Sequence, residues 1–334
     1  MVEAQPINAR ELVMDLIATA NNPVPTGAIS GFVKTPDGIR LRFARWDATA
    51  EPARGTVCVF PGRAEYIEKY FEVVADLRRR GFAVAVLDWR GQGGSDRLLD
   101  NPYKGHVRNF KEYDRDLATF MQEVVLPNCK PPYIALAHSM GGNILLRQAV
   151  VKNSWFSRMI LTAPMIDISP EQHKGWRRGS VRAASELGGL LAWRRYASGG
   201  QDKPLDMGVF DGNELTSDPD RFHRNHLIVQ AAPQLALGSA TYGWLRAALR
   251  SIARETEPDY PRRVEVPLLI FAAGQDTIVS TTAIEAFAQK LKVGTHVLIP
   301  EARHEILQET DGVRQRFWTA FDAYMGIEKT PASA

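Results

Sequence analysis

Three residues of this 334-residue chain have the types and the order that could make a serine hydroxyl reactive: Ser139, Asp276 and His304. A serine hydroxyl is a poor nucleophile at neutral pH, so a histidine has to accept its proton and a carboxylate has to fix the tautomer of that histidine. Ser139 lies in the segment Ala137-His138-Ser139-Met140-Gly141, where an apolar run changes into a helical pattern. Strand, sharp turn and helix are typical of a nucleophile elbow, whose small residues make room for a strained serine.

The acid and the base are expected directly after two later strands. Asp276 follows the apolar run at 267–273, and His304 follows the run at 295–299. Catalytic groups collect at the carboxyl ends of parallel strands. Because Ser139 is expected at the same edge, the order serine, acid, histidine predicts that the three side chains converge.

Each of these residues also has an ordinary structural interpretation. Ser139 can be a helix N-cap, Asp276 a turn carboxylate before the next helix, and His304 a surface histidine. Asp167, after the strand expected at 158–163, is a rival for the acid. His138 precedes the serine and is expected to pack at the turn. The joint arrangement favours catalysis over three separate structural roles.

Backbone N–H groups are needed to hold the negative oxygen of a tetrahedral intermediate. Met140, directly after the serine, supplies one candidate. The loop Phe60-Pro61-Gly62-Arg63-Ala64-Glu65-Tyr66 follows an earlier strand, and by position the N–H of Arg63 is the second candidate. The alternative for Pro61-Gly62 is an ordinary turn that ends the strand.

The elements around these residues alternate between strand and helix, which indicates an α/β fold with a doubly wound, mostly parallel sheet. An antiparallel hairpin is expected at the start, with a turn at Pro36-Asp37-Gly38. The alternation stops after the sixth strand and returns near residue 267. We therefore expect a helical cap at 166–261, inserted into a core formed by 1–165 and 262–334.

Composition excludes several classes of protein. The chain is 45% hydrophobic and 24% charged, and its net charge of +3 gives no reason to expect a nucleic-acid partner. Cys58 and Cys129 have no metal-like or redox-like spacing, so neither a metal nor another cofactor is expected. The start of the chain lacks the pattern of a secretory signal, and no run is apolar enough to span a membrane. A cytoplasmic location is expected.

The motifs resemble those of monoacylglycerol lipases and bacterial lysophospholipases, which have the α/β-hydrolase fold. The loop at 60–66 is similar to their His-Gly-x-x-x-Glu oxyanion loop, with Pro61 in place of the histidine. Asp88-Trp89-Arg90-Gly91-Gln92-Gly93-Gly94-Ser95-Asp96 is similar to their Asp-x-Arg-Gly-x-Gly-x-Ser segment, and residues 137–142 to their Gly-His-Ser-Met-Gly-Gly, with Ala137 for the first glycine. The resemblance covers 31–165 and 262–326 and implies a lipid ester as substrate.

The first part of the expected cap is basic and rich in aromatic residues. Between 170 and 200 it holds six basic residues and two acidic ones: Lys174, Arg177, Arg178, Arg182, Arg194, Arg195, Glu171 and Glu186. Trp176, Trp193 and Tyr196 are interleaved with them. This pattern is typical of an interfacial helix that touches the inner face of a membrane, or of a pocket for an acyl chain with an anionic head. A solvated basic face that packs its apolar side on the core is the alternative.

The leading hypothesis is a serine hydrolase that cleaves a carboxylic ester of a lipid, a lysophospholipid or a monoacylglycerol, through an acyl-serine intermediate. A small-ester carboxylesterase or an aminopeptidase with the same three residues is the first alternative. The aminopeptidase ranks lower because it needs acidic residues near the pocket to hold a free amine, whereas the first half of the cap is basic. The alternative from another class is a non-catalytic, ligand-binding hydrolase scaffold.

Overall fold

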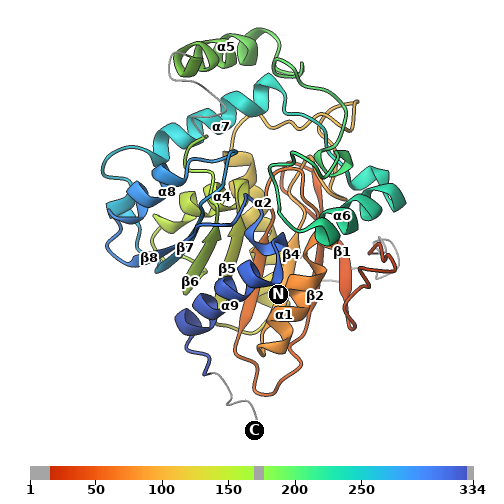
Figure 1. Cartoon of the computed structure of the whole chain (residues 1–334), viewed down its shortest axis with the longest axis vertical. Coiled ribbons are helices and arrows are strands. Elements are labelled where there is room, and N and C mark those ends of the chain that lie inside the picture. Colours follow the sequence, from red (N-terminus) through yellow and green to blue (C-terminus); the bar gives the residue numbers. More distant parts are fainter. Residues whose placement is uncertain (1–15, 169–176, 329–334) are drawn as a thin grey trace, which may run out of the picture.

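The computed structural model describes residues 16–168 and 177–328, and in these residues the centre of the molecule is an eight-stranded sheet (Figure 1). The strand order is β1-β2-β4-β3-β5-β6-β7-β8; β1, β2 and β4 pair antiparallel, and the remaining pairs are parallel. This confirms the predicted fold class and the predicted hairpin. The strands are β1 Ile29–Lys34, β2 Arg40–Trp46, β3 Thr56–Phe60, β4 Ala83–Leu87, β5 Tyr133–His138, β6 Arg158–Thr162, β7 Leu268–Ala273 and β8 Gly294–Ile299.

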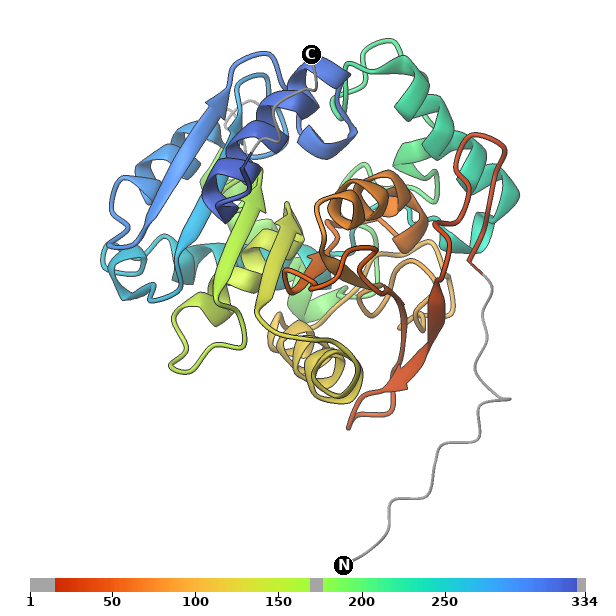
Figure 2. The ribbon, with the colours of Figure 1, turned by 90° about the horizontal axis from the view of Figure 1, so that it is seen from below.

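The strands β3, β4 and β7 are buried along their whole length, as expected for a sheet that is covered on both faces. Successive side chains of a strand point to opposite faces, so Val57 and Val59 enter one hydrophobic cluster while Cys58 and Phe60 enter the other. One cluster includes residues of α2, α4 and α8, and the other includes residues of α1 and α9. Figure 2 shows helices on both sides of the sheet.

Helices connect the parallel strands. Helix α2 before β5 is α-helical as far as Thr119 and continues as a π-helical segment, Phe120–Val125. The helices are α1 Phe71–Arg79, α2 Lys111–Thr119, α3 Leu126–Asn128, α4 Met140–Ala149, α5 Arg177–Leu191, α6 Pro219–Ala231, α7 Tyr242–Glu255, α8 Thr281–Ala288 and α9 Asp311–Met325.

The segment between β6 and β7 contains α5, α6 and α7 and, in its described part, adds no strand to the sheet. Helix α5 lies over α7 at the far side from the sheet (Figure 1), and Leu187, Leu190 and Leu191 are 60%, 62% and 78% exposed. Glu171, Lys174 and Trp176, which belong to the basic and aromatic stretch noted in the sequence, lie outside the described residues. None of the helices in the described ranges is long and apolar enough to cross a membrane.

The register of the parallel strands brings their carboxyl ends to one edge of the sheet. His138 at the end of β5 pairs with Thr162 of β6, and Ala273 at the end of β7 pairs with Ile299 of β8. Thr162 pairs in turn with Phe271, so the loops that follow β7 and β8 begin at the same edge as the loop after β5, two residues further along. This places the three residues predicted for nucleophilic chemistry within reach of one another.

Candidate active site

Ser139 occupies a sharp turn between β5 and α4 with φ of 49° and ψ of −113°. This left-handed conformation is unfavourable for a residue with a side chain, and the surrounding contacts have to hold it in place. The N–H of Ser139 donates to the carbonyl of Thr162 (3.0 Å), and its carbonyl accepts from Met165 (3.0 Å). A Cβ at Gly141 would lie 2.3 Å from the carbonyl oxygen of Phe60, so this position of the elbow requires glycine.

The structure brings Ser139, His304 and Asp276 together in one chain of polar contacts. His304 Nε2 lies 3.0 Å from Ser139 Oγ, and His304 Nδ1 lies 2.7 Å from Asp276 Oδ2. Asp276 also accepts the N–H groups of Ile278 (2.8 Å) and Val279 (2.9 Å) through Oδ1. With Nδ1–H donated to the carboxylate, Nε2 is left to accept the proton of the serine hydroxyl.

The charges around His304 favour its protonated form. Burial works against ionisation of both partners, but the imidazole of His304 and the two backbone donors lower the pKa of Asp276 below its usual value. The ionised Asp276 outweighs the effect of burial on His304 and raises the pKa of the imidazole above 6.5. A histidine in this setting is a stronger base than one in water, which suits proton removal from a hydroxyl.

The rival residues occupy other positions. Asp167 accepts the N–H of Ile168 through its carboxylate, while the Nδ1 of His304 contacts Asp276. His138 packs its ring against that of His304 at 4.7 Å, and its Nδ1 lies 3.1 Å from the carbonyl of Thr162. Burial lowers the pKa of His138 to about 4, so this ring is neutral at neutral pH.

The two amides predicted for the oxyanion hole have no hydrogen-bond partner within the described part of the chain. The N–H of Gly62 donates to Glu65, and that of Ala64 donates to Gln92 (3.3 Å). In this stretch of the loop, the N–H of Arg63 is therefore available, as is that of Met140 at the start of α4. Two free donors beside a serine hydroxyl are the arrangement that a tetrahedral oxyanion needs.

Pro61 stands where the similar oxyanion loops have a histidine, and other side chains hold the loop that carries Arg63. The carboxylate of Glu65 accepts from the N–H of Gly62 and from the hydroxyl of Tyr70. Gln92 Nε2 donates to the carbonyl of Gly62 (2.7 Å), and Trp89 Nε1 donates to that of Pro61 (2.9 Å). These side chains come from the loop itself, from α1's preceding turn and from the segment after β4.

A cavity of about 310 Å³ opens at Ser139 and His304 and has two kinds of wall. One is apolar and includes Met140, Met165, Ile168, Leu215, Ala240, Trp244, Ile278 and Val279. The other is charged and includes Glu65, Lys69, Asp206, Glu214 and Glu305. A ligand that fits both walls has a long apolar part and a compact polar part.

The charged wall centres on the buried ammonium group of Lys69, which the sequence analysis missed. Its Nζ lies 2.7 Å from Glu305, 3.3 Å from Asp206 and 3.7 Å from Glu65. Three carboxylates share one ammonium, and burial together with its acidic neighbours raises the pKa of Glu305 to about 7. Glu305 Oε2 has no hydrogen-bond partner among the described residues. The pairing of Glu65 with Lys69 at i,i+4 was the only part of this cluster visible in the sequence.

The loop that carries His304 is fastened to the segment before α6. The N–H of Glu305 donates to the carbonyl of Leu215 (2.8 Å), and Arg303 Nη1 donates to those of Asn213 (3.0 Å) and Thr216 (3.1 Å). The geometry of the histidine therefore depends on residues from between β6 and β7 as well as on the sheet.

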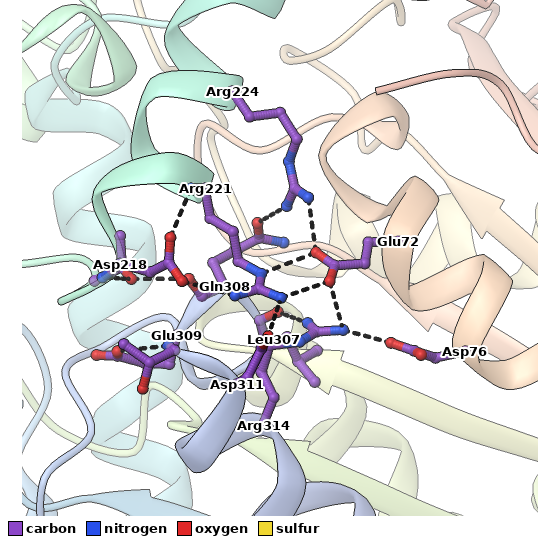
Figure 3. A network of polar contacts seen from close by, with 12 residues as sticks. Glu72, Asp76, Asp218, Arg221, Arg224, Leu307, Gln308, Glu309, Asp311 and Arg314 are labelled. Carbon is purple, nitrogen blue, oxygen red and sulfur yellow. Dashed lines mark hydrogen bonds and ion pairs between the residues drawn. The ribbon is translucent and has the colours of Figure 1, made fainter. Parts of the chain in front are cut away.

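A network of arginines and carboxylates, the cap clamp, extends this connection (Figure 3). Its centre is Glu72 of α1, which accepts from Arg221 and Arg224 of α6 and pairs with Arg314 of α9 at 3.3 Å. The other members are Asp76, Asp218, Gln308 and Asp311. The clamp ties α6 to two helices that cover the sheet.

Comparison with known proteins agrees with this geometry. The sequence profile of the family described as "Serine aminopeptidase, S33" matches residues 51–311. Lysophospholipase L2 of Escherichia coli (strain K12) is 32% identical over 290 residues, 83% of this chain and 82% of that protein. The monoglyceride lipase of Rattus norvegicus is 26% identical over 282 residues, 82% of this chain and 86% of that protein.

Two solved structures are similar in fold. A soluble variant of monoglyceride lipase from Saccharomyces cerevisiae, in complex with a substrate analog, has a TM-score of 0.70 at 21% identity, covering 90% of this chain and 97% of that one. The monoacylglycerol lipase of Paleococcus ferrophilus has a TM-score of 0.68 at 19% identity, covering 86% and 99%. The chain therefore has the α/β-hydrolase fold and belongs to the family of serine hydrolases described as serine aminopeptidase, S33.

Proposed function

We propose that the protein hydrolyses a carboxylic ester that joins one long acyl chain to a small polar alcohol, as in a monoacylglycerol or a lysophospholipid. The single observation that carries the proposal is the hydrogen-bonded chain from Ser139 through His304 to Asp276, next to two free amides and an apolar wall. The names of relatives, lysophospholipase L2 and monoglyceride lipase, support the same substrate class.

The reaction follows from the roles that we propose for these residues. Ser139 Oγ attacks the ester carbonyl while His304 Nε2 takes the hydroxyl proton, and the N–H groups of Arg63 and Met140 hold the oxyanion. The carbon–oxygen bond to the alcohol then breaks, and His304 returns the proton to the leaving oxygen. Water attacks the acyl-serine, again giving its proton to His304, and the fatty acid leaves as Ser139 recovers its hydrogen. Asp276 stays ionised and orients the imidazole throughout.

The two walls of the cavity suggest how a substrate lies. The apolar wall takes the acyl chain, because burying each methylene there stabilises the complex by about 0.8 kcal/mol. The charged wall around Lys69 takes the alcohol. Its three carboxylates exceed one ammonium, so hydroxyl or ammonium groups suit it better than a bare anion.

A second candidate function, removal of an N-terminal amino acid from a peptide, is favoured by one observation. The basic first half of the expected cap spoke against this function, but Glu65, Asp206 and Glu305 line the cavity itself. Glu305 Oε2, without a partner in the described residues, could accept a hydrogen bond from a free amine. The family description points to the same activity. The two candidates differ in whether the apolar wall or the charged wall provides most of the binding.

We also propose that residues 166–261 form a cap inserted into a core of 1–165 and 262–334, and that the cap touches the lipid surface. Three leucines of α5 are more than half exposed, and α5 itself lies on the side of the molecule farthest from the sheet (Figure 1). Exposed leucines beside arginines are typical of a peripheral contact with an anionic membrane surface. The expected cytoplasmic location, on the inner face of the membrane, belongs to this proposal.

One set of assays tests the proposed function. A fluorophosphonate probe should label the wild-type protein and Ser157→Ala, an exposed-serine control, but not Ser139→Ala. Release should then be measured from a monoacylglycerol, a lysophospholipid, a nitrophenyl acetate and an amino-acid nitroanilide. We expect the two lipids to give the highest kcat/KM. Labelling of Ser139→Ala would contradict the catalytic assignment, whereas turnover of the anilide alone would replace the lipid by a peptide substrate.

A further inference from the structure

We propose that a second cavity, between α5, α7 and the loop before α2, binds the phosphate or carboxylate group of an anionic ligand. The cavity has a volume of about 230 Å³ and is lined by His106, Arg108, Gly189, Trp193, Gly243 and Arg246. It shares no lining residue with the cavity at Ser139. The proposal is independent of the reaction at that serine.

The walls of the second cavity carry more positive than negative charge. The guanidinium groups of Arg108 and Arg194 lie 4.5 Å and 4.3 Å from the centre of the Trp193 ring. Neither forms an ion pair with a carboxylate among the residues that the structure describes. Arg246 is paired with Glu186 (2.7 Å), but the same carboxylate also pairs with Arg250 (2.9 Å). Arg108 and Arg246 line the cavity, and Arg194 and Arg250 lie beside these two residues or their partners, so one carboxylate among four guanidinium groups leaves an excess of positive charge for an anion.

His106 adds a directed donor to this charge. Thr241 Oγ1 accepts the N–H of Trp244 (3.2 Å), and His106 Nδ1, 2.8 Å away, is the one acceptor for its hydroxyl hydrogen among the described residues. The ring proton is then on Nε2, which has no hydrogen-bond partner in the described residues although the side chain is only 4% exposed. Buried donors are almost always paired, so an unpaired one in a basic cavity points to a ligand oxygen as its acceptor.

The electrostatic environment of His106 agrees with an anion as the missing partner. Burial, followed by repulsion from Arg108 and Arg194, lowers the pKa of His106 to about 4. The imidazole is neutral at neutral pH and keeps the single Nε2–H as a donor. An anion bound between the arginines would offset their repulsion and raise the pKa of the ring. This change gives a readout that does not depend on enzymatic activity.

Two glycines allow the walls of the cavity to come together. A Cβ at Gly243 would lie 2.5 Å from His106 Cε1, and a Cβ at Gly189 would lie 2.3 Å from Arg246 Cδ. Any other residue at these positions would displace the histidine or the arginine. The ring of Trp193, 5.0 Å from that of His106, provides a flat apolar side. The site therefore suits a phosphate or carboxylate that carries an organic group, as well as inorganic phosphate.

The first test follows the His106 ring by NMR in the full-length protein labelled on histidine. The resonance is assigned with His106→Gln, and inorganic phosphate is then titrated at constant ionic strength. We expect phosphate to shift the resonance and to raise the pKa of the ring. Arg108→Gln should weaken the binding of phosphate about tenfold, which is the effect of losing one charge-assisted hydrogen bond. Arg262→Gln, an exposed arginine paired with Asp259 on the connection to β7, should leave the affinity unchanged.

The second test distinguishes the source of the anion. Wild type, Arg108→Gln and Arg262→Gln are sedimented with phosphatidylcholine vesicles that contain or lack phosphatidylglycerol. Loss of binding to the anionic vesicles in Arg108→Gln alone identifies a lipid headgroup as the ligand, whereas a response to phosphate without this loss identifies a soluble anion. If phosphate leaves His106 unchanged and both variants sediment like the wild type, the proposal is wrong. A circular dichroism spectrum and a urea midpoint equal to those of the wild type verify that Arg108→Gln is folded.

Discussion

Replacement of Glu72 by glutamine tests whether the charge at the centre of the cap clamp stabilises the folded protein. Glu72 receives hydrogen bonds of 2.9 Å and 2.6 Å from Arg221 and one of 2.7 Å from Arg224. Glutamine has the same shape but offers only one acceptor oxygen and no charge. In Glu72→Gln the buried Arg224 keeps Gln308 as a partner but loses its carboxylate, while Arg221 keeps Asp218. We therefore expect a loss of stability.

The size of the loss follows from the pKa of Glu72. Burial opposes ionisation, but its arginine partners lower the pKa from 4.5 to about 2. One pKa unit corresponds to about 1.36 kcal/mol, so the ionised Glu72 contributes at most roughly 3.4 kcal/mol to the free energy of unfolding. The side chain is 26% exposed, and solvent screening reduces the expected loss in the free energy of unfolding to about 2 kcal/mol. Asp311→Asn is the matched control. Asp311 is 91% exposed, so its replacement should lower the free energy of unfolding by less than about 0.5 kcal/mol.

Urea denaturation at two pH values measures this difference. The pKa of Glu72 is lower in the folded than in the unfolded state, so its stabilisation is complete above about pH 4.5 and is lost as the pH falls towards 2. The gap between wild type and Glu72→Gln at pH 3.5 should be roughly three fifths of the gap at pH 7. Equal stability of Glu72→Gln and Asp311→Asn at pH 7, or a gap that does not shrink at pH 3.5, would refute the reasoning.

Three further predictions concern the site itself. Asp276→Asn should lower kcat by about 10³- to 10⁴-fold with unchanged circular dichroism, because the imidazole loses the partner that fixes its tautomer; a fall of less than tenfold would speak against this role. The pKa of His304 is raised above 6.5, so kcat/KM should decline with falling pH through a midpoint above 6.5. A kcat/KM that stays constant from pH 8 to pH 6 would contradict the assignment of His304 as the base. Gly141→Ala should lower the urea midpoint strongly or prevent folding, because its Cβ would lie 2.3 Å from a backbone oxygen, whereas Gly312→Ala, with nothing within 4 Å, should match the wild type.

Local signals in the sequence predicted the scaffold of the site. Short apolar runs identified the strands, and the order of Ser139, Asp276 and His304 after three of them predicted which side chains would meet. The structure places His304 within 3.0 Å of both Ser139 and Asp276, and the catalytic roles of the three residues are our proposal. The loop at Arg63 was also located from the strand before it. These predictions depend on neighbours in the sequence and on one rule, that parallel strands end at a common edge.

The charged surroundings of the site could not be predicted in this way. Lys69 meets Asp206 and Glu305, which lie 137 and 236 residues further along the chain, and no periodicity links them. The same holds for Glu72 and Arg221, which are 149 residues apart. Buried ionic contacts depend on how helices from separate segments pack, so a single sequence carries no pattern for them. The π-helical continuation of α2 likewise has no counterpart in the hydrophobic spacing.

The bonds between the His304 loop and the segment before α6 have a consequence for protein engineering. One design for a new specificity would exchange the proposed cap, 166–261, with the corresponding segment of a relative. Here Arg303 and Glu305 depend on backbone carbonyls at 213–216, and Gln308 depends on Arg224. A chimera that received only a foreign 166–261 would keep His304 in place only if its backbone followed the same path beside 303–305. A transplant that carries 303–314 together with the proposed cap keeps both partners of each of these hydrogen bonds. The unit to exchange is therefore discontinuous in sequence.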